Sequence, residues 1–155
     1  MFESTIASGT SRATQTTESV QRQLDQAVQA LAPGWTLQPE TYPPVNIGKL
    51  YKWAGKANND KLSVWVNQYP DATEADARLR GIRLSVGQHW VTGIGDAAFV
   101  GFVSREGPAT LYFRVDKTYA QIHVPMSTAS SDSSAVDLAL RLGQRVARIL
   151  SERQQ

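Results

Sequence analysis

The feature that most constrains the fold is a pair of alternating segments, residues 109–115 and 118–124, separated by Asp116-Lys117. A two-residue polar break between alternating runs predicts a β-hairpin, here with Arg114 paired with Tyr119. This register separates apolar from polar side chains, and a shift of one residue would mix the two sets. The apolar face contains Ala109, Leu111, Phe113, Val115, Thr118, Ala120, Ile122 and Val124. We therefore expect helices to cover that face of a larger sheet.

The opposite face of this hairpin is polar and aromatic. Side chains of this kind on a strand most often form a solvated outer face, which is the favoured interpretation. The alternative is a ligand-binding surface, whose candidate residues are Tyr112, Arg114, Tyr119, Gln121 and His123, with Thr110 on the same face.

The rest of the chain supplies helices and further strands. Apolar residues at helical spacing predict one helix before Pro33-Gly34, a second from Pro70 to Gly87 and a third after the SDSS segment at 131–134. Gly81, inside the second helix, is expected to weaken it or to mark close packing. Alternating segments on either side of the turn-rich residues 55–60 predict a second hairpin, whose strands begin near Ile47 and Lys61.

These elements predict an α+β fold. It would have a mainly antiparallel sheet of about five strands and three helices, in the order α-β-β-α-β-β-β-α. Residues 1–16 are small and polar without periodicity and are predicted to be a flexible tail, followed by a single domain over residues 17–152.

Composition narrows the function classes. The chain has 155 residues, a net charge of +2 and no cysteine, so disulfides, thiol catalysis and cysteine metal sites are excluded. It has no Lys/Arg run that would follow a phosphate backbone, so we expect no nucleic-acid partner. It has no apolar stretch long enough for a transmembrane segment. The small polar composition with few lysines is typical of an exported bacterial protein, periplasmic or extracellular with its signal removed; the alternative is cytoplasmic.

No motif reaches the strength of a catalytic or metal site. The string Gly93-Ile94-Gly95-Asp96 precedes a strand and lacks a third glycine, so it predicts a turn with positive φ in which Asp96 bonds to the local backbone. His89 and His123 have no ligand partner at suitable spacing and are predicted to be structural. We therefore predict no metal, no cofactor and no catalytic residue, which argues mildly against an enzyme.

Two further groups of residues have a structural and a functional interpretation. Tyr51, Trp53 and Trp65 lie in predicted strands, where aromatic residues usually pack in the core; the alternative is an aromatic platform that stacks on a sugar ring or another flat ligand.

One side of the last helix carries three arginines, Arg141, Arg145 and Arg148. They are expected to form a solvated helix face, and the alternative is a stripe that binds anions or lipid headgroups.

Four segments together resemble a known type of domain. They are the helix that starts at YPDA, the GIGDAAF string, the hairpin with the sequence LYFRVDKTYAQIHV and the helix with the sequence LALRLGQRVARIL. Over residues 47–150 the chain resembles small exported bacterial lipoproteins and extracellular sensor domains, some with a PsbP-like sandwich. The resemblance implies a non-catalytic module of the cell envelope and transfers no functional residue. The chain departs from this type in having no signal and no lipid-attachment cysteine.

Three functions remain. The first is a non-enzymatic binding or sensing module of the bacterial envelope, with a small molecule or an envelope protein as partner. The second is an interaction or assembly protein, which would expose a large apolar patch. The third is a small hydrolase or isomerase, which would place His123 or His89 within hydrogen-bond distance of an acid in a pocket.

Overall fold

The computed structural model describes residues 20–38, 48–55, 61–86, 89–102, 109–125 and 132–153. The predicted tail at residues 1–16 lies outside them. The strands are β1 (Thr36–Leu37), β2 (Lys49–Ala54), β3 (Lys61–Gln68), β4 (His89–Val91), β5 (Ala97–Phe102), β6 (Ala109–Val115) and β7 (Thr118–Val124). The helices are an N-terminal helix over residues 20–31, α2 (Ala72–Val86) and α3 (Asp132–Arg153).

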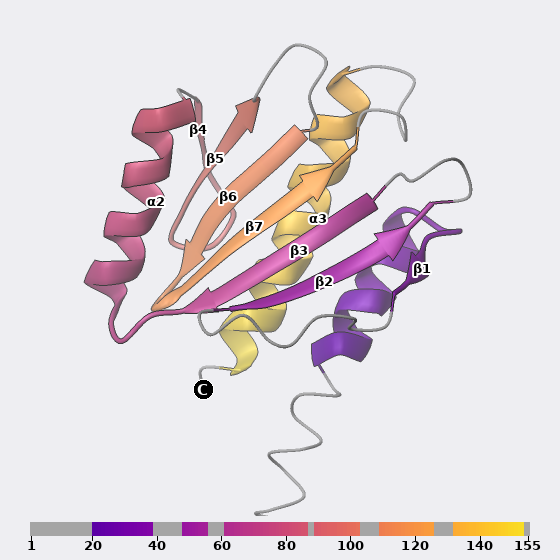
Figure 1. Cartoon of the computed structure of the whole chain (residues 1–155), viewed down its shortest axis with the longest axis horizontal. Helices are drawn as coiled ribbons and strands as arrows, with labels where there is room; N and C mark the ends of the chain where they lie inside the picture. The colour runs from indigo at the N-terminus through magenta and orange to yellow at the C-terminus, as the bar shows by residue number, and fades with distance from the viewer. Residues whose placement is uncertain are drawn as a thin grey trace, which may run out of the picture.

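The strands form one antiparallel sheet in the order β1-β2-β3-β7-β6-β5-β4 (Figure 1). The prediction of an α+β fold with three helices and an antiparallel sheet is confirmed, but the sheet has seven strands and not five. The two additional strands, β1 and β4, are its edges and have only two and three residues. Strands this short contain too little alternation to be recognised, and short edges also limit pairing with other chains.

The chain builds this sheet from both ends towards the middle. The β2–β3 hairpin forms one half, α2 then crosses to the far edge, and the β4–β7 meander returns until β7 pairs with β3. The register of the β6–β7 hairpin is the predicted one, with Arg114 opposite Tyr119. The start of α2 is capped by the Asp71 side chain, which accepts a hydrogen bond of 2.8 Å from the Glu74 N–H.

The helices are divided unequally between the two faces of the sheet. The N-terminal helix and α3 lie on one face, which we call the two-helix face, and α2 lies on the other, the α2 face (Figure 1). The core of the two-helix face includes Leu24, Trp53, Leu111, Ile122 and Val146, each fully buried or nearly so. A smaller core on the α2 face contains Leu79, Phe99, Tyr112 and Tyr119.

Close packing of helix and sheet depends on a glycine in α3. A Cβ on Gly143 would overlap the Leu111 side chain of β6, so glycine lets the helix approach the sheet closely. Gly81 of α2 has no atom within 4 Å of the same position. The prediction that Gly81 marks close packing was therefore wrong; that role belongs to Gly143.

Replacing each of these glycines with alanine is expected to have opposite effects. Gly81→Ala should raise the free energy of unfolding by about 0.5–1 kcal/mol, because alanine has the higher helix propensity and its methyl group meets nothing. Gly143→Ala should lower it by up to about 2 kcal/mol, because overlap with Leu111 outweighs the same gain. Urea denaturation measures both. A Gly143→Ala protein as stable as Gly81→Ala would show that Leu111 moves aside without cost.

Candidate functional site

The polar and aromatic face of the β6–β7 hairpin is part of the α2 face and is largely covered. Tyr112 and Tyr119 are only 6% and 2% exposed, under Leu79 of α2. The favoured prediction of a solvated face was therefore wrong for these residues, because α2 crosses directly over them. The Tyr112 ring stacks on Phe99, with ring centroids 4.8 Å apart. Burial raises the pKa of both tyrosines, so they remain neutral phenols.

Arg114 is committed to a network of hydrogen bonds and ion pairs within the protein. Its Nε donates to Asp76 of α2 at 3.2 Å, and its Nη1 lies 3.4 Å from the Asp96 carboxylate and donates to the Asp116 carbonyl at 2.9 Å. Asp76 also accepts from Arg80 at 2.6 Å. This bond, followed by the charges of Arg80 and Arg114, lowers the pKa of Asp76. Arg114 thus joins α2, the turn before β5 and the β6–β7 turn.

The glycine string before β5 forms the predicted turn. Gly93 and Gly95 have φ values of 85° and 58°. A Cβ on Gly95 would also collide with the Arg114 carbonyl oxygen, so this position requires glycine twice over. Asp96, in contrast, does not bond to the local backbone as predicted. Its carboxylate accepts from the Asp116 N–H at 2.6 Å, twenty residues away.

His123 and Gln121 keep part of their surface outside the α2 contact. The Nδ1 atom of His123 lies 3.1 Å from the Thr110 hydroxyl, and burial lowers the pKa of His123. The Gln121 side-chain oxygen accepts from the Tyr119 hydroxyl at 2.9 Å. Within the described segments, neither His123 nor His89 has a carboxylate partner.

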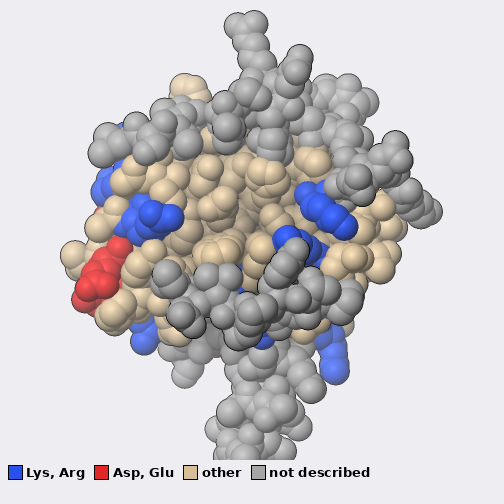
Figure 2. Space-filling model, viewed as in Figure 1, with Lys and Arg blue, Asp and Glu red and all other residues tan. Residues whose placement is uncertain are grey.

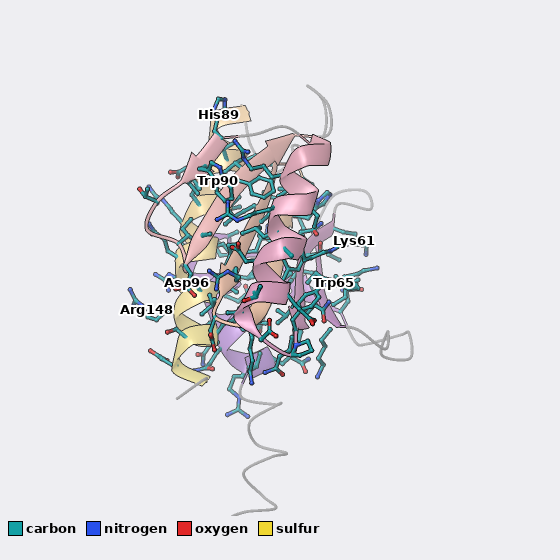
Figure 3. The ribbon with its side chains drawn as sticks, turned by 90° about the vertical axis from the view of Figure 1, so that its left-hand side faces the viewer. Lys61, Trp65, His89, Trp90, Asp96 and Arg148 are labelled. Atoms are coloured by element: carbon teal, nitrogen blue, oxygen red, sulfur yellow. The ribbon has the colours of Figure 1, made fainter. Side chains whose placement is uncertain are left out.

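The alternative aromatic platform of Tyr51, Trp53 and Trp65 does not form. Trp53 is fully buried on the two-helix face, where its indole N–H donates to Asp25 of the N-terminal helix at 2.9 Å. Tyr51, two residues earlier, is buried on the same face. Trp65 pairs with Leu50 and Gln121 and so projects to the α2 face (Figure 3). The register of the β2–β3 hairpin therefore places Trp65 on the opposite face from Tyr51 and Trp53.

Trp65 instead joins the uncovered part of the polar face. Because β3 pairs with β7, Trp65 lies beside Gln121 and Ser63 beside His123. We call these four residues, all partly exposed, the Trp65 hollow. Figure 2 shows this face as an uncharged, hollowed surface with Lys and Arg side chains to either side. The sequence identified Trp65, Gln121 and His123 but assigned them to separate sites, since only the long-range β3–β7 pairing brings them together.

The described residues contain no group of three or more His, Asp or Glu side chains that could hold a metal ion. None of the helices in those segments is both long and apolar enough to cross a membrane.

Comparison with known proteins gave no relative from which a function could be transferred: no family model, no curated protein and no solved structure matches the chain.

The Arg114 network is expected to matter far more for stability than an exposed ion pair. Arg114→Leu should lower the free energy of unfolding by roughly 2–3 kcal/mol, because it removes the hydrogen bonds that a largely buried guanidinium group makes to Asp76, Asp96 and the Asp116 carbonyl. Arg141→Leu, which removes a pair with Asp137 whose side chains are 65% and 59% exposed, should cost less than about 0.5 kcal/mol. Urea denaturation compares the two variants, and equal losses would contradict the structural role of Arg114.

The burial of His123 predicts a pH dependence of stability. Its pKa in the folded protein lies below the ordinary value of 6.5, so the unfolded chain takes up the proton first as the pH falls. Stability should therefore decrease below about pH 6.5, and His123→Gln should remove part of this decrease. Unfolding free energies measured between about pH 7.5 and 5.5 test this. Identical pH dependence in both proteins would show that His123 is not desolvated.

Proposed function

We propose that this protein is a non-enzymatic binding or sensing module of the bacterial envelope, and that a small neutral ligand binds in the Trp65 hollow. The observation that supports this most directly is the unequal cover of the sheet. Two helices lie on one face, whereas α2 packs mainly on β5, β6 and β7 of the other, with Arg80 and Arg83 on Trp90 of β4. The neighbouring part of the α2 face contains the Trp65 hollow, with a partly exposed tryptophan and the three polar side chains of Ser63, Gln121 and His123.

The side chains of the hollow suit a flat ligand that also forms hydrogen bonds. The indole of Trp65 offers an apolar ring face, which stacks well on a sugar or an aromatic ring. Gln121 uses its side-chain oxygen for Tyr119, so its amide NH₂ group is available to a ligand. His123 uses Nδ1 for Thr110, so Nε2 is available. The lowered pKa of His123 favours the neutral ring, which fits an uncharged ligand.

The two other functions receive less support. Among the described residues the only large hydrophobic side chain that is exposed is Trp90, at 39%, whereas an assembly surface would need an apolar patch of several hundred Å². A hydrolase or isomerase would need an acid beside His123, and the partner that the described residues provide is a threonine. Location in the envelope rests on the composition and on the resemblance to exported domains.

The proposal is tested by a ligand screen with paired tryptophan variants. Thermal unfolding is measured with a panel of neutral sugars and neutral heteroaromatic compounds. A compound that raises the melting temperature of the wild type should lose this effect in Trp65→Leu, because its stacking surface is gone. Trp90→Leu is the matched control: it lies on the same face but beside α2, where Arg80 and Arg83 pack on its ring at 5.3 Å and 5.0 Å.

Three results would overturn the proposal. The first is that no compound stabilises the wild type. The second is that Trp65→Leu retains the full shift of every hit. The third is that Trp65→Leu and Trp90→Leu lose the shift equally, which would indicate a general loss of stability.

A further inference from the structure

The opposite side of the molecule has a groove with a different chemistry. It lies between the N-terminal helix and α3 and has a volume of about 620 Å³. Arg141, Arg145 and Arg148 line it from α3, and Gln23 and Gln26 face them from the N-terminal helix. Arg148 lies on the outer side of α3, away from the α2 face (Figure 3). The groove is therefore separated from the Trp65 hollow by the full thickness of the sheet.

The charge of this groove is positive. None of the described residues that line it is acidic. Arg141 has Asp137 as a partner at 3.0 Å, but this pair is mostly exposed. Arg145 and Arg148 form no ion pair with any residue in the described parts of the chain. At least two guanidinium groups are thus available to a ligand that brings negative charge.

Helix electrostatics do not account for all three arginines. Cations near a helix C-terminus are stabilised by the helix dipole, but the effect is confined to about the last turn. The helix α3 ends at Arg153, so Arg141 and Arg145 lie well before that turn. Two explanations remain for Arg141 and Arg145 on the wall of the groove. Their side chains are either solvated without a partner, or they bind a ligand.

The arrangement of the groove matches an extended acidic peptide. The helical rise separates Arg141 from Arg145 by ~6 Å, close to the ~6.6–6.8 Å between alternate residues on one side of a strand. Guanidinium groups bind carboxylates through two parallel hydrogen bonds. The glutamine amides can donate to and accept from a peptide backbone. Apolar surface of Leu31 and Ile149 also lines the groove and can receive the intervening side chains.

We propose that the groove between the N-terminal helix and α3 binds an extended acidic peptide segment of a partner protein, with alternate carboxylates on Arg141 and Arg145 and a further carboxylate on Arg148. A concave groove fits a chain-like ligand better than a flat lipid surface. This site is independent of the Trp65 hollow, and either can exist without the other.

The experiment uses a fluorescein-labelled peptide of alternating Glu and Val and a matched peptide of alternating Gln and Val. Fluorescence anisotropy with the full chain should show saturable binding of the Glu peptide, weakened by added salt. Arg145→Gln/Arg148→Gln should weaken binding about tenfold. The control Lys61→Gln/Arg78→Gln removes the same charge from exposed positions on β3 and α2 and should bind as the wild type does. Circular dichroism confirms that each variant is folded.

Several outcomes would overturn the inference. They are the absence of saturable binding at low salt, equal binding of the Gln peptide, and equal weakening in both double variants. A last arm uses vesicles of anionic phospholipid. If these bind through Arg145 and Arg148 while the Glu peptide does not, the partner is a membrane surface and the peptide proposal is wrong.

Discussion

The arrangement of the α2 face depends on Arg114. Its guanidinium group connects Asp76 of α2, Asp96 in the turn before β5 and the Asp116 carbonyl in the β6–β7 turn, and its side chain is only 16% exposed. Asp76, Asp96 and Asp116 lie at least twenty residues apart in the sequence. With α2 fixed by this contact, Leu79 is held over Tyr112 and Tyr119, and the second core of the protein is closed. The ion pairs are worth more here than on an open surface because solvent screens them less.

The position of the Trp65 hollow follows from the order of the strands. The strand β3 lies in the middle of the sheet, beside β7, and the next strand along the chain, β4, forms the far edge. The connecting helix α2 must therefore cross β7, β6 and β5, and it does not return over β3 and β2. The same crossover that buries Tyr112 and Tyr119 leaves Trp65, Gln121 and His123 partly exposed. The part of the α2 face over β3 is thus left uncovered because of the order of the strands, and not because a helix lacks an apolar face.

Patterns within one segment of the sequence predicted the helices and hairpins. The candidate site, in contrast, depends on pairing between segments that are far apart in the chain. The alternation on both sides of Asp116-Lys117 fixed a hairpin register that the structure confirms, since a shift would have mixed the two faces. In contrast, Arg114 and Asp96 gave no local signal of their contact, because the two residues are eighteen positions apart. The sequence likewise could not show that Trp53 and Trp65 face opposite sides, as this depended on the β2–β3 register across a turn of uncertain length.

The two proposed surfaces differ in chemistry because they are built on different elements. The hollow lies on strand residues beside an aromatic core, where burial has already made His123 favour its neutral form. The groove lies between two exposed helix faces, where arginine side chains carry their charge into solvent at little cost. Between them stands the core of the two-helix face, where Trp53 holds the N-terminal helix through Asp25. The groove arginines are exposed and lie on the other side of the sheet from the hollow. Changing them therefore leaves the hollow intact, and each proposal stands on its own evidence.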